Sequence, residues 1–317
     1  MATTVPRVSI GMPVYNGMKY LRYALDSILQ QNYTDFELII SDNASTDATQ
    51  NICLEYAEKD NRIRYHRNET NIGATSNFNR VLELARGEFF KWAAHDDVHL
   101  PGFLRRCIEV IESAPATVVL VTPKAVVIDE HGKNVAGITV ENLDTRNPQP
   151  NQRVANVMRK IFWASAQYGL FRVEALKKTR LIGPFYASDN VFLAEVAALG
   201  QIWEIPELLF QARYHPDMSA RANKGWRSLQ DWFEPSGRDV KRIFPPFFRT
   251  GIEYLCAFAQ MHVSMQERFL CCLNVFTVWY PRQFRILFHA WRNKIGLRTR
   301  LKKIFTNMSG RFTITCQ

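Results

Sequence analysis

Apolar and polar positions between residues 7 and 96 repeat in one order: a short apolar run, a polar loop, and a longer stretch with apolar residues at helical spacing. The apolar runs predict strands and the amphipathic stretches predict helices. In chain order we expect a strand over 7–12, a helix over 20–31, a strand over 36–41, a helix over 48–59, a strand over 63–66, a helix over 74–85 and a strand from 89. This order is typical of right-handed βαβ units on a parallel sheet.

The strand that begins at Phe89 runs into two adjacent carboxylates, Asp96 and Asp97, and Pro101 stops any continuation of its ladder. Ligands of open α/β sheets bind outside the carboxyl ends of the strands. Neighbouring like charges are tolerated best around a cation or hydrogen-bond donors, and Mg²⁺ is usually held by one or two carboxylates plus substrate phosphates. The segment therefore predicts a metal site for a diphosphate or, equally, a solvated turn that caps a helix starting near Gly102.

Polar loops follow the first two predicted strands, one over Pro13 to Gly17 and one over Asp42 to Asp47. Parallel strands bring such loops to one edge of the sheet, so we expect the ligand site there. A dinucleotide fold would need GxGxxG after the first strand, and a P-loop would need GxxxxGKS or GxxxxGKT, but the chain has neither motif. Nucleotide recognition would therefore use something other than a glycine-rich cradle.

The strand followed by PVYN, the strand followed by SDNASTD, the NIG turn and the strand ending in HDD resemble, in this order, family two of the nucleotide-sugar glycosyltransferases. The resemblance covers Val8 to about Arg221. It implies an α/β fold of the GT-A type, an αβα sandwich with a mostly parallel central sheet. It also implies an inverting enzyme that moves a sugar from a nucleoside-diphosphate sugar, a UDP-sugar by family habit, to an acceptor hydroxyl in polysaccharide or glycolipid assembly.

The resemblance implies nucleotide-binding roles for the early loops. Pro13, Tyr15 and Asn16 would line the nucleotide pocket, with Tyr15 packed against the base. Asp42 would accept a hydrogen bond from the base, and the turn from Asn71 to Gly73 would close over it. The alternatives are a packing aromatic for Tyr15 and a helix cap for Asp42.

The resemblance also implies the chemical roles. Asp96 would lie near the ribose and Asp97 would bind the divalent metal, Mn or Mg, on the diphosphate. His215 would be a metal ligand or a donor to the leaving phosphate, and Arg221 would neutralise phosphate charge. Asp189, at the start of a helix predicted over 191–199, would be the general base, although Asp is also a common N-cap. We expect the helix N-terminus to keep the pKa of Asp189 low.

The remaining pattern predicts further strands and helices and one long polar loop. We expect a helix over 102–113, strands over 118–123 and 126–129, a loop over 141–152, a helix over 154–163 and strands over 169–172, 202–205 and 208–213. The loop over 141–152 could act as a lid or contact the acceptor. The acceptor is expected to be a carbohydrate or a lipid-linked sugar.

Composition indicates a globular protein, with 47% hydrophobic and 22% charged residues. The six cysteines form no CxxC pair, and residues 1–7 contain no apolar signal region. We therefore expect a cytoplasmic protein with reduced thiols and no transmembrane helix.

The net charge of +10 lies in the last quarter of the chain: residues 236–317 contain 14 Lys and Arg against 3 Asp and Glu, and the rest contains 26 against 27. We expect a GT-A domain over 1–235 and a basic, aromatic-rich extension over 236–317, with helices over 250–272 and 280–305. The extension could be an accessory bundle or homodimer face, or an amphipathic segment on the anionic inner face of a membrane. No nucleic-acid-binding module accompanies the charge.

Two other classes of function share this sequence pattern. A nucleotidyltransferase would use the same αβα plan and acidic residues, but it would normally have a glycine-rich, basic loop where this chain has Pro13 to Gly17. A non-catalytic scaffold could keep the fold without the chemistry. The reaction products distinguish a glycosyltransferase from these two classes, because a scaffold releases no nucleoside diphosphate and a nucleotidyltransferase releases pyrophosphate.

Overall fold

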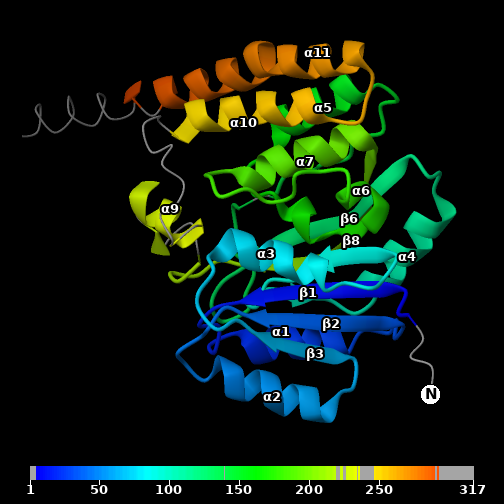
Figure 1. Cartoon of the computed structure of the whole chain (residues 1–317), viewed down its shortest axis with the longest axis vertical. Coiled ribbons are helices and arrows are strands. Elements are labelled where there is room, and N and C mark those ends of the chain that lie inside the picture. The colour runs from blue at the N-terminus through cyan, green and yellow to red at the C-terminus, as the bar shows by residue number, and fades with distance from the viewer. Residues whose placement is uncertain are drawn as a thin grey trace, which may run out of the picture.

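Eight strands form one mixed sheet in the computed structural model of the chain, which describes residues 5–138, 140–218, 222–223, 226–233, 235, 246–289 and 291–292 (Figure 1). The strand order is β3-β2-β1-β4-β7-β6-β8-β5. The strands are β1 Val8–Val14, β2 Phe36–Asp42, β3 Ile63–Arg67, β4 Phe89–Trp92, β5 Val98–His99, β6 Val118–Ile128, β7 Leu170–Arg172 and β8 Gln201–Arg213.

The first half of the sheet confirms the predicted βαβ units. β1 pairs in parallel with β2 and β4, and β2 pairs in parallel with β3. The connecting helices are α1 Leu21–Leu29, α2 Thr49–Lys59 and α3 Ala74–Glu83. In the register of the first pair, Val14 lies beside Asp42, so the polar loops after β1 and β2 leave the sheet at the same edge.

The second half of the sheet is mixed. β7 is antiparallel to both of its neighbours, β4 and β6, whereas β8 is parallel to β6 and antiparallel to β5. The helices in this half are α4 Phe103–Ser113, α5 Pro150–Lys160, the 3-10 turn η1 Ser165–Tyr168, α6 Val173–Leu176 and α7 Ser188–Leu199.

Three predicted details of the strands are wrong. β6 and β8 are each one long strand where two were expected, because register shifts near Pro123 and Lys124 bend the pair without ending it. β4 ends at Trp92, so Asp96 and Asp97 lie in a loop beyond the strand. The two-residue strand β5 follows this loop, and a hydrophobic run that short gives no periodic signal.

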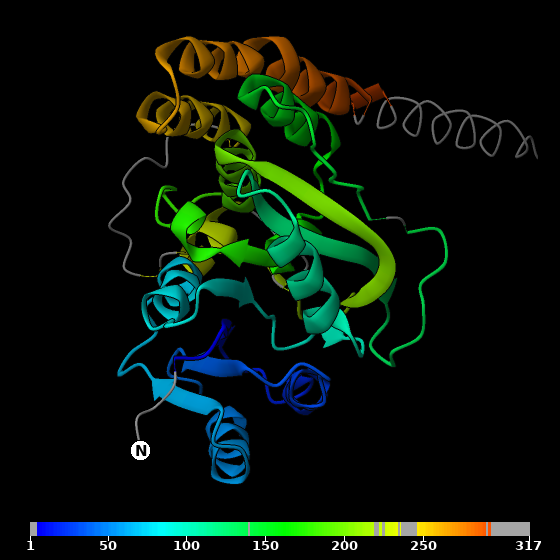
Figure 2. The ribbon, with the colours of Figure 1, turned by 90° about the vertical axis from the view of Figure 1, so that its right-hand side faces the viewer.

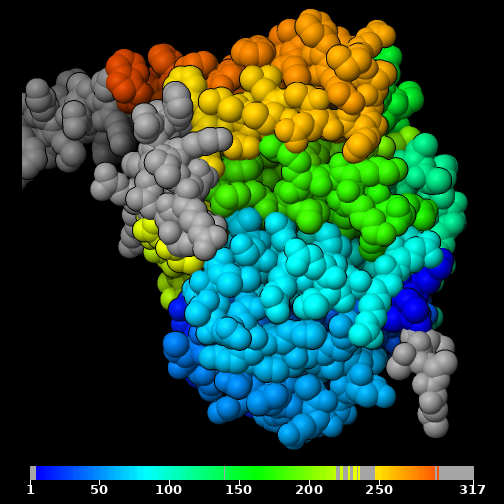
Figure 3. All heavy atoms as spheres, in the orientation of Figure 1, coloured from blue at the N-terminus to red at the C-terminus, as the bar shows by residue number. Residues whose placement is uncertain are grey.

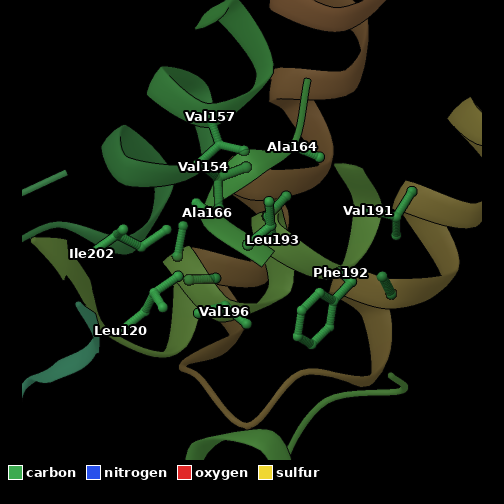
Figure 4. Packing of buried hydrophobic residues seen from close by; sticks show 14 of the residues in the cluster. Leu120, Val154, Val157, Ala164, Ala166, Val191, Phe192, Leu193, Val196 and Ile202 are labelled. Carbon is green, nitrogen blue, oxygen red and sulfur yellow. The ribbon is translucent and has the colours of Figure 1, made fainter. Parts of the chain in front are cut away.

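Apolar residues form two buried clusters. One includes residues of α1 and α4, and the other packs β6 against α5 and α7. In Figure 4, Leu120 of β6, Val157 of α5 and Leu193 of α7 point into the same cluster. α7 is buried on nearly all sides because it lies between other elements, which explains why its sequence is almost uniformly apolar.

The C-terminal helices pack onto this second cluster (Figures 1 and 2). They are α10 Pro246–Gln260, α11 Met265–Asn274 and the π-helical segment η2 Val275–Trp279, after which helix continues through the described residues up to 292. The short helix α9 Trp226–Phe233 instead packs against α3. Tyr254 and Phe258 of α10 and Trp279 of η2 are buried members of the cluster. Within the ranges given above, no helix has both the length and the apolar character needed to span a membrane.

The helix predicted over 250–272 is interrupted. Ser264 is the N-cap of α11 and its Oγ accepts a hydrogen bond from the backbone N–H of Glu267 at 3.2 Å. This S-x-x-E spacing is a helix-start signal that the periodicity alone concealed. The helix predicted over 280–305 is confirmed as far as residue 289 and at 291–292, and its remaining residues lie outside the described part of the chain.

Candidate active site

A pocket of about 1310 Å³ opens at the sheet edge where β1, β2 and β4 end. Segments that are far apart in sequence line it: the loop after β1, the turn before α3, the acidic loop after β4, residues 162–168, the start of α7, the end of β8, α9 and Arg249 of α10. Pro13 and Tyr15 lie in the wall, and the Tyr15 side chain is 42% exposed to the opening. A flat ring that remains this exposed is available to stack on a ligand.

Asn16 joins the loops that follow β1 and β2. Its φ of 50° is in the left-handed region, where Asn is tolerated better than most residues. Its Oδ1 accepts a hydrogen bond from Thr46 N–H at 2.8 Å, and its own N–H donates to Ser45 Oγ at 2.9 Å. The N–H of Gly17 donates to Thr49 Oγ1 at 2.9 Å. These bonds fix the two loops against each other before any ligand binds.

Asp42 supports the pocket from behind. It is fully buried and does not line the pocket, whereas the next residue, Asn43, does. Its carboxylate accepts hydrogen bonds from Tyr65 Oη at 2.7 Å, Arg67 Nη1 at 2.8 Å and Ser45 N–H at 2.8 Å. A base that bonded to Asp42 would therefore have to compete with these partners.

The turn before α3 is tied to the loop after β2. Asn71 lines the pocket, and its Oδ1 accepts hydrogen bonds from Asn43 Nδ2 at 2.8 Å and from Gly73 N–H at 2.9 Å. Gly73 has a φ of 85°, and a Cβ there would lie 2.4 Å from the carbonyl oxygen of Phe233 in α9. Glycine is required at this position because α9 lies against the turn.

Asp97 is buried and Asp96 is half-buried, and the two carboxylates have different hydrogen-bond partners. Asp97 Oδ1 accepts a hydrogen bond from Arg213 N–H at 2.8 Å, and Asp96 Oδ2 lies 2.8 Å from His215 Nε2. Burial, followed by the charge of Asp96, raises the pKa of Asp97 well above its ordinary value. Burial also acts on Asp96, but the charge of His95 and the bond to His215 outweigh it and lower the pKa of Asp96.

This arrangement fits a cation that takes its remaining ligands from a substrate. Among the residues that the structure describes, no three His, Cys, Asp or Glu side chains form a group that could hold a metal ion. Asp97 nevertheless faces a repulsion from Asp96 that a cation would relieve. His215 Nε2 is engaged with Asp96, whereas its buried Nδ1 has no hydrogen-bond partner among the described residues.

Asp189 lies in the same pocket as the acidic pair. It is the second residue of α7, and Ala187 occupies the N-cap position, so the capping alternative is wrong. Asp189 Oδ1 accepts the N–H of Asn190 at 2.8 Å. Burial is the largest effect and raises the pKa of Asp189 to about 6, with a further contribution from the charge of Glu141. The low pKa expected from the helix N-terminus is also wrong, because burial outweighs the hydrogen bonds.

Tyr168 is influenced by the charges of both the acidic pair and Asp189. It lines the pocket at the end of η1. Its pKa is raised well above the ordinary value by burial and then by the charges of Asp97, Asp96 and Asp189. Tyr168, the acidic pair and Asp189 all line the same pocket, which agrees with the influence of all three carboxylates on its hydroxyl.

Exposed aromatic side chains line the wall on the Asp189 side. Phe162 is 56% exposed and Tyr186 is 55% exposed, although both lie in the pocket. The segment that carries Phe162 is held by Glu141, whose carboxylate accepts hydrogen bonds from Trp163 N–H at 2.9 Å and Ser165 N–H at 3.1 Å. Glu141 thus connects this wall to Asp189, whose pKa it helps to raise.

The structure brings most of the predicted site residues together. The pocket is lined by Pro13, Tyr15, Asn16, Asn71, Asp96, Asp97, Asp189 and His215. Asp42 and Gly73 lie behind the wall, and Arg221 is outside the described residues.

Sequence reasoning missed Arg213, Glu141 and Tyr168. Arg213 ends a predicted strand, as the acidic pair was thought to do, so the same rule applied to that strand would have found it. Glu141 is the first residue of the polar loop predicted over 141–152. Tyr168 directly precedes the strand predicted over 169–172, but nothing in its local pattern distinguishes it from a packing aromatic.

A largely parallel sheet covered by helices, with a nucleotide-sized pocket at the carboxyl ends of its first strands, defines the GT-A class of glycosyltransferases. The family model "Glycosyl transferase family 2" matches residues 9–180, which is more than half of the chain, and the chain belongs to this family.

Curated relatives are also glycosyltransferases by name. An uncharacterized glycosyltransferase of Rickettsia felis is 33% identical over 140 residues, which cover 44% of this chain but only 23% of the relative. An uncharacterized glycosyltransferase of Haemophilus influenzae is 24% identical over 221 residues, 68% of each chain. The glycosyltransferase GlyG of Streptococcus pneumoniae is 31% identical over 113 residues, 36% of this chain and 38% of the relative.

Two solved structures share the fold at low sequence identity. S. aureus TarS 1–349 in complex with UDP has a TM-score of 0.60 and 17% identity over 85% of this chain and 70% of that one. The mannosyltransferase PcManGT from Pyrobaculum calidifontis in complex with GDP-Man and Mn²⁺ has a TM-score of 0.51 and 16% identity over 96% of this chain and 84% of that one. These likenesses show a common architecture.

Proposed function

We propose that this protein is an inverting, metal-dependent glycosyltransferase that moves a sugar from a nucleoside-diphosphate sugar to an acceptor hydroxyl, in the assembly of a polysaccharide or glycolipid. The observation that carries the proposal is the single pocket that contains both the acidic pair and Asp189, with Tyr168 subject to the charge of all three carboxylates. UDP is the favoured nucleotide because the TarS structure contains it, and GDP is the second choice because PcManGT binds GDP-Man.

The donor would bind along the loops after β1, β2 and β4. Tyr15 offers an exposed ring to the base, and Asn43 and Asn71 offer amide groups in the pocket wall. Asp42 would keep the floor in place through Arg67, or bond to the base if that ion pair opened. Arg221 would neutralise phosphate charge from the segment that follows β8.

Asp97, together with Nδ1 of His215, would hold a divalent cation, Mn²⁺ or Mg²⁺. When bound, such a cation neutralises charge on the departing diphosphate. Asp96 would lie near the ribose while its bond with His215 keeps it ionised. Arg213 positions both carboxylates, because its N–H bonds to Asp97 and its Nε donates to the Asp96 carbonyl oxygen at 2.8 Å.

Asp189 would act as the general base. With a pKa of about 6 it is mostly ionised at neutral pH and is still basic enough to take a proton. The acceptor oxygen would attack the anomeric carbon as its proton passes to Asp189. The bond from that carbon to the phosphate oxygen would break, and its electron pair would leave with the diphosphate. One displacement of this kind inverts the anomeric configuration.

The acceptor would lie against Phe162 and Tyr186. Aromatic rings that stay exposed inside a pocket cost little to cover with the apolar face of a sugar ring. Both line the pocket that contains Asp189, so the acceptor class we favour is a carbohydrate, either free or as the headgroup of a lipid-linked acceptor.

A product assay tests the proposal. Purified protein is incubated with UDP- and GDP-sugars, with and without Mn²⁺ or Mg²⁺, and the products are identified. We expect metal-dependent release of a nucleoside diphosphate by the wild type and by Asp217→Asn, whose side chain at the pocket rim is 70% exposed, but not by Asp189→Asn. Release of pyrophosphate, or of no nucleotide from any donor, would contradict the proposal.

A further inference from the structure

One side of α11 and of the helix that continues from it carries exposed apolar side chains along its described length. The residues recur every three, four or eight positions, so they lie on one helical face. Their exposed fractions range from 43% for Leu273 to 76% for Met265. We call this face the apolar stripe, and it consists of Met265, Phe269, Leu273, Phe276, Phe284, Phe288 and Trp291.

The stripe points away from the rest of the protein. Cys271, Val275 and Trp279 recur every four residues on the opposite side of the helix and are buried in the cluster shared with α5, α7 and α10. In Figure 3 the segment that carries the stripe forms the outer edge of the molecule above α10. Phe284 also touches the body of the protein, since its ring centroid lies 6.3 Å from that of Phe247 in α10. The other exposed side chains form an apolar surface, and large exposed apolar patches on a monomer usually mark an interaction site.

Neighbouring rings make the stripe continuous. Tyr280 is half-buried against α10, with its ring 6.0 Å from that of Phe248, and it lies between Phe276 and Phe284 at ring-centroid distances of 6.0 Å and 6.4 Å. Phe288 and Trp291 lie 5.9 Å apart. The result is an elongated aromatic surface along one helix, and not a set of isolated exposed residues.

Glu267 is the one acidic residue within the stripe's range, and its carboxylate accepts a hydrogen bond from Asn151 N–H at 3.0 Å. From Arg268 to Gln317 the sequence contains ten Lys and Arg and no Asp or Glu. Arg282 is used in packing, since it donates to the carbonyl oxygens of Met158 and Ile161. Arg285 and Arg292, by contrast, are exposed next to the stripe.

This charge decides which partner suits the stripe. Two copies of the stripe face to face would bring mainly positive charges together, including the exposed Arg285 and Arg292, which opposes self-association. An anionic lipid surface complements both features, because aromatic side chains settle at the boundary between headgroups and acyl chains while Lys and Arg meet the phosphates. We propose that the apolar stripe docks this protein on an anionic membrane surface.

Docking would also place the pocket close to lipid. α10 packs against α11 and contributes Arg249 to the pocket wall, so one helix connects the docking helix to the catalytic pocket. A lipid-linked sugar acceptor would then reach the pocket from the membrane. This last step rests on the proposed function, whereas membrane binding itself does not.

Vesicle sedimentation of the full chain tests the docking. We expect binding to vesicles of phosphatidylcholine with phosphatidylglycerol, and far weaker binding to phosphatidylcholine alone. Phe269→Ser with Phe276→Ser should weaken binding by roughly ten-fold for each ring lost. Arg285→Glu with Arg292→Glu should weaken it by roughly five-fold or more for each charge reversed.

Matched controls keep the outcome clear. Leu54→Ser removes a side chain that is 43% exposed on α2, at the opposite end of the molecule, and Lys178→Glu reverses an exposed charge away from the stripe. Both controls should bind like the wild type, and all variants should keep wild-type melting curves and basal nucleoside-diphosphate release in solution. Failure to sediment with anionic vesicles, equal binding by the stripe variants, or a solution dimer that Phe269→Ser with Phe276→Ser converts to monomer would overturn the proposal.

Discussion

The two walls of the pocket are built on different principles. On the wall formed by the loops after β1 and β2, polar groups bond mainly to one another: Asn16 to Ser45 and Thr46, and Asp42 to Arg67. On the wall formed by residues 162–168 and the start of α7, aromatic rings stay exposed and a half-buried carboxylate, Asp189, has a raised pKa. The hydrogen bonds of the first wall are made before a ligand arrives. The second wall keeps aromatic rings and a carboxylate available to a ligand.

The two walls also differ in how much of each lies within the range matched by the family model. The first wall lies entirely within residues 9–180, where the family model matches. Part of the second wall, including Asp189 and Tyr186, and the helices that support it lie beyond that range. We therefore expect changes in the first wall to affect donor binding and changes in the second to affect transfer to the acceptor.

Asp189→Asn should give the largest effect. Asparagine keeps an Oδ1 that can accept the N–H of Asn190, so the start of α7 should be undisturbed, but it cannot accept a proton at neutral pH. Transfer should fall by about 10³-fold while donor affinity is unchanged. Rates are measured as nucleoside diphosphate released in the presence of acceptor, with Asp217→Asn as the matched control. Near wild-type turnover by Asp189→Asn would show that Asp189 is not the general base.

The pH profile of transfer should show Asp189 directly. Its pKa of about 6 means that the ionised, active base is lost as the pH falls below that value. kcat/KM should therefore be level near neutral pH and fall by about ten-fold per unit on the acid side. A profile that is flat down to the ordinary range of an exposed carboxylate would show that burial does not control the base.

Truncating the exposed rings should give a smaller and selective effect. Phe162→Ala with Tyr186→Ala removes the aromatic surface beside Asp189 without opening the core, since both side chains are more than half exposed. The acceptor KM should rise by roughly ten-fold. Nucleotide affinity should not change. A matching loss of nucleotide affinity would place the donor, and not the acceptor, on this wall.

The smallest effect concerns stability beneath the first wall. Lys91 of β4 is fully buried, with its Nζ 2.8 Å from His99 Nε2, and burial lowers its pKa to about 7. Between this value and the ordinary pKa of lysine, the unfolded chain binds more protons than the folded one. The free energy of unfolding should therefore rise with pH by about 1 kcal/mol per unit from neutrality to about pH 8.5.

Lys91→Met isolates this effect. Urea unfolding at several pH values should show a shallower slope for the variant than for the wild type over that range. Equal slopes of unfolding free energy against pH would mean that Lys91 keeps its charge in the folded protein. The carboxylates of the loop that carries Asp96 and Asp97 would then balance that charge.

Much of the fold could be predicted because its signals are local. The alternation of strands and amphipathic helices predicted the parallel half of the sheet, with strand and helix ends placed within about two residues except at the end of β4. The mixed half was harder, because the pairing of β5 with β8 and the antiparallel insertion of β7 depend on contacts between distant residues. The break before α11 was missed because its signal is the capping pair Ser264 and Glu267, not a change in periodicity.

The site was predictable to the extent that the four family motifs carry it. Those motifs predicted residues that line one pocket. They could not show that Arg67 donates a hydrogen bond to the carboxylate of Asp42, or that burial raises the pKa of Asp189. Burial is a property of the whole fold. Local sequence therefore predicted the wrong direction for the pKa shift of Asp189, because the helix N-terminus alone suggested a lowered pKa. Tyr168 became visible only when the sheet placed it between carboxylates from distant segments.

Calorimetric titration with UDP and GDP tests the central claim most directly, because it asks whether the acidic pair holds a cation for a nucleoside diphosphate. The titrations use the wild type, Asp97→Asn and Asp217→Asn, each with and without Mn²⁺. Asparagine at position 97 can still accept the N–H of Arg213 but loses the charge. The account predicts metal-dependent binding by the wild type and Asp217→Asn, and its loss in Asp97→Asn. Equal binding by all three proteins without metal, or no binding of either nucleotide by the wild type, would contradict it.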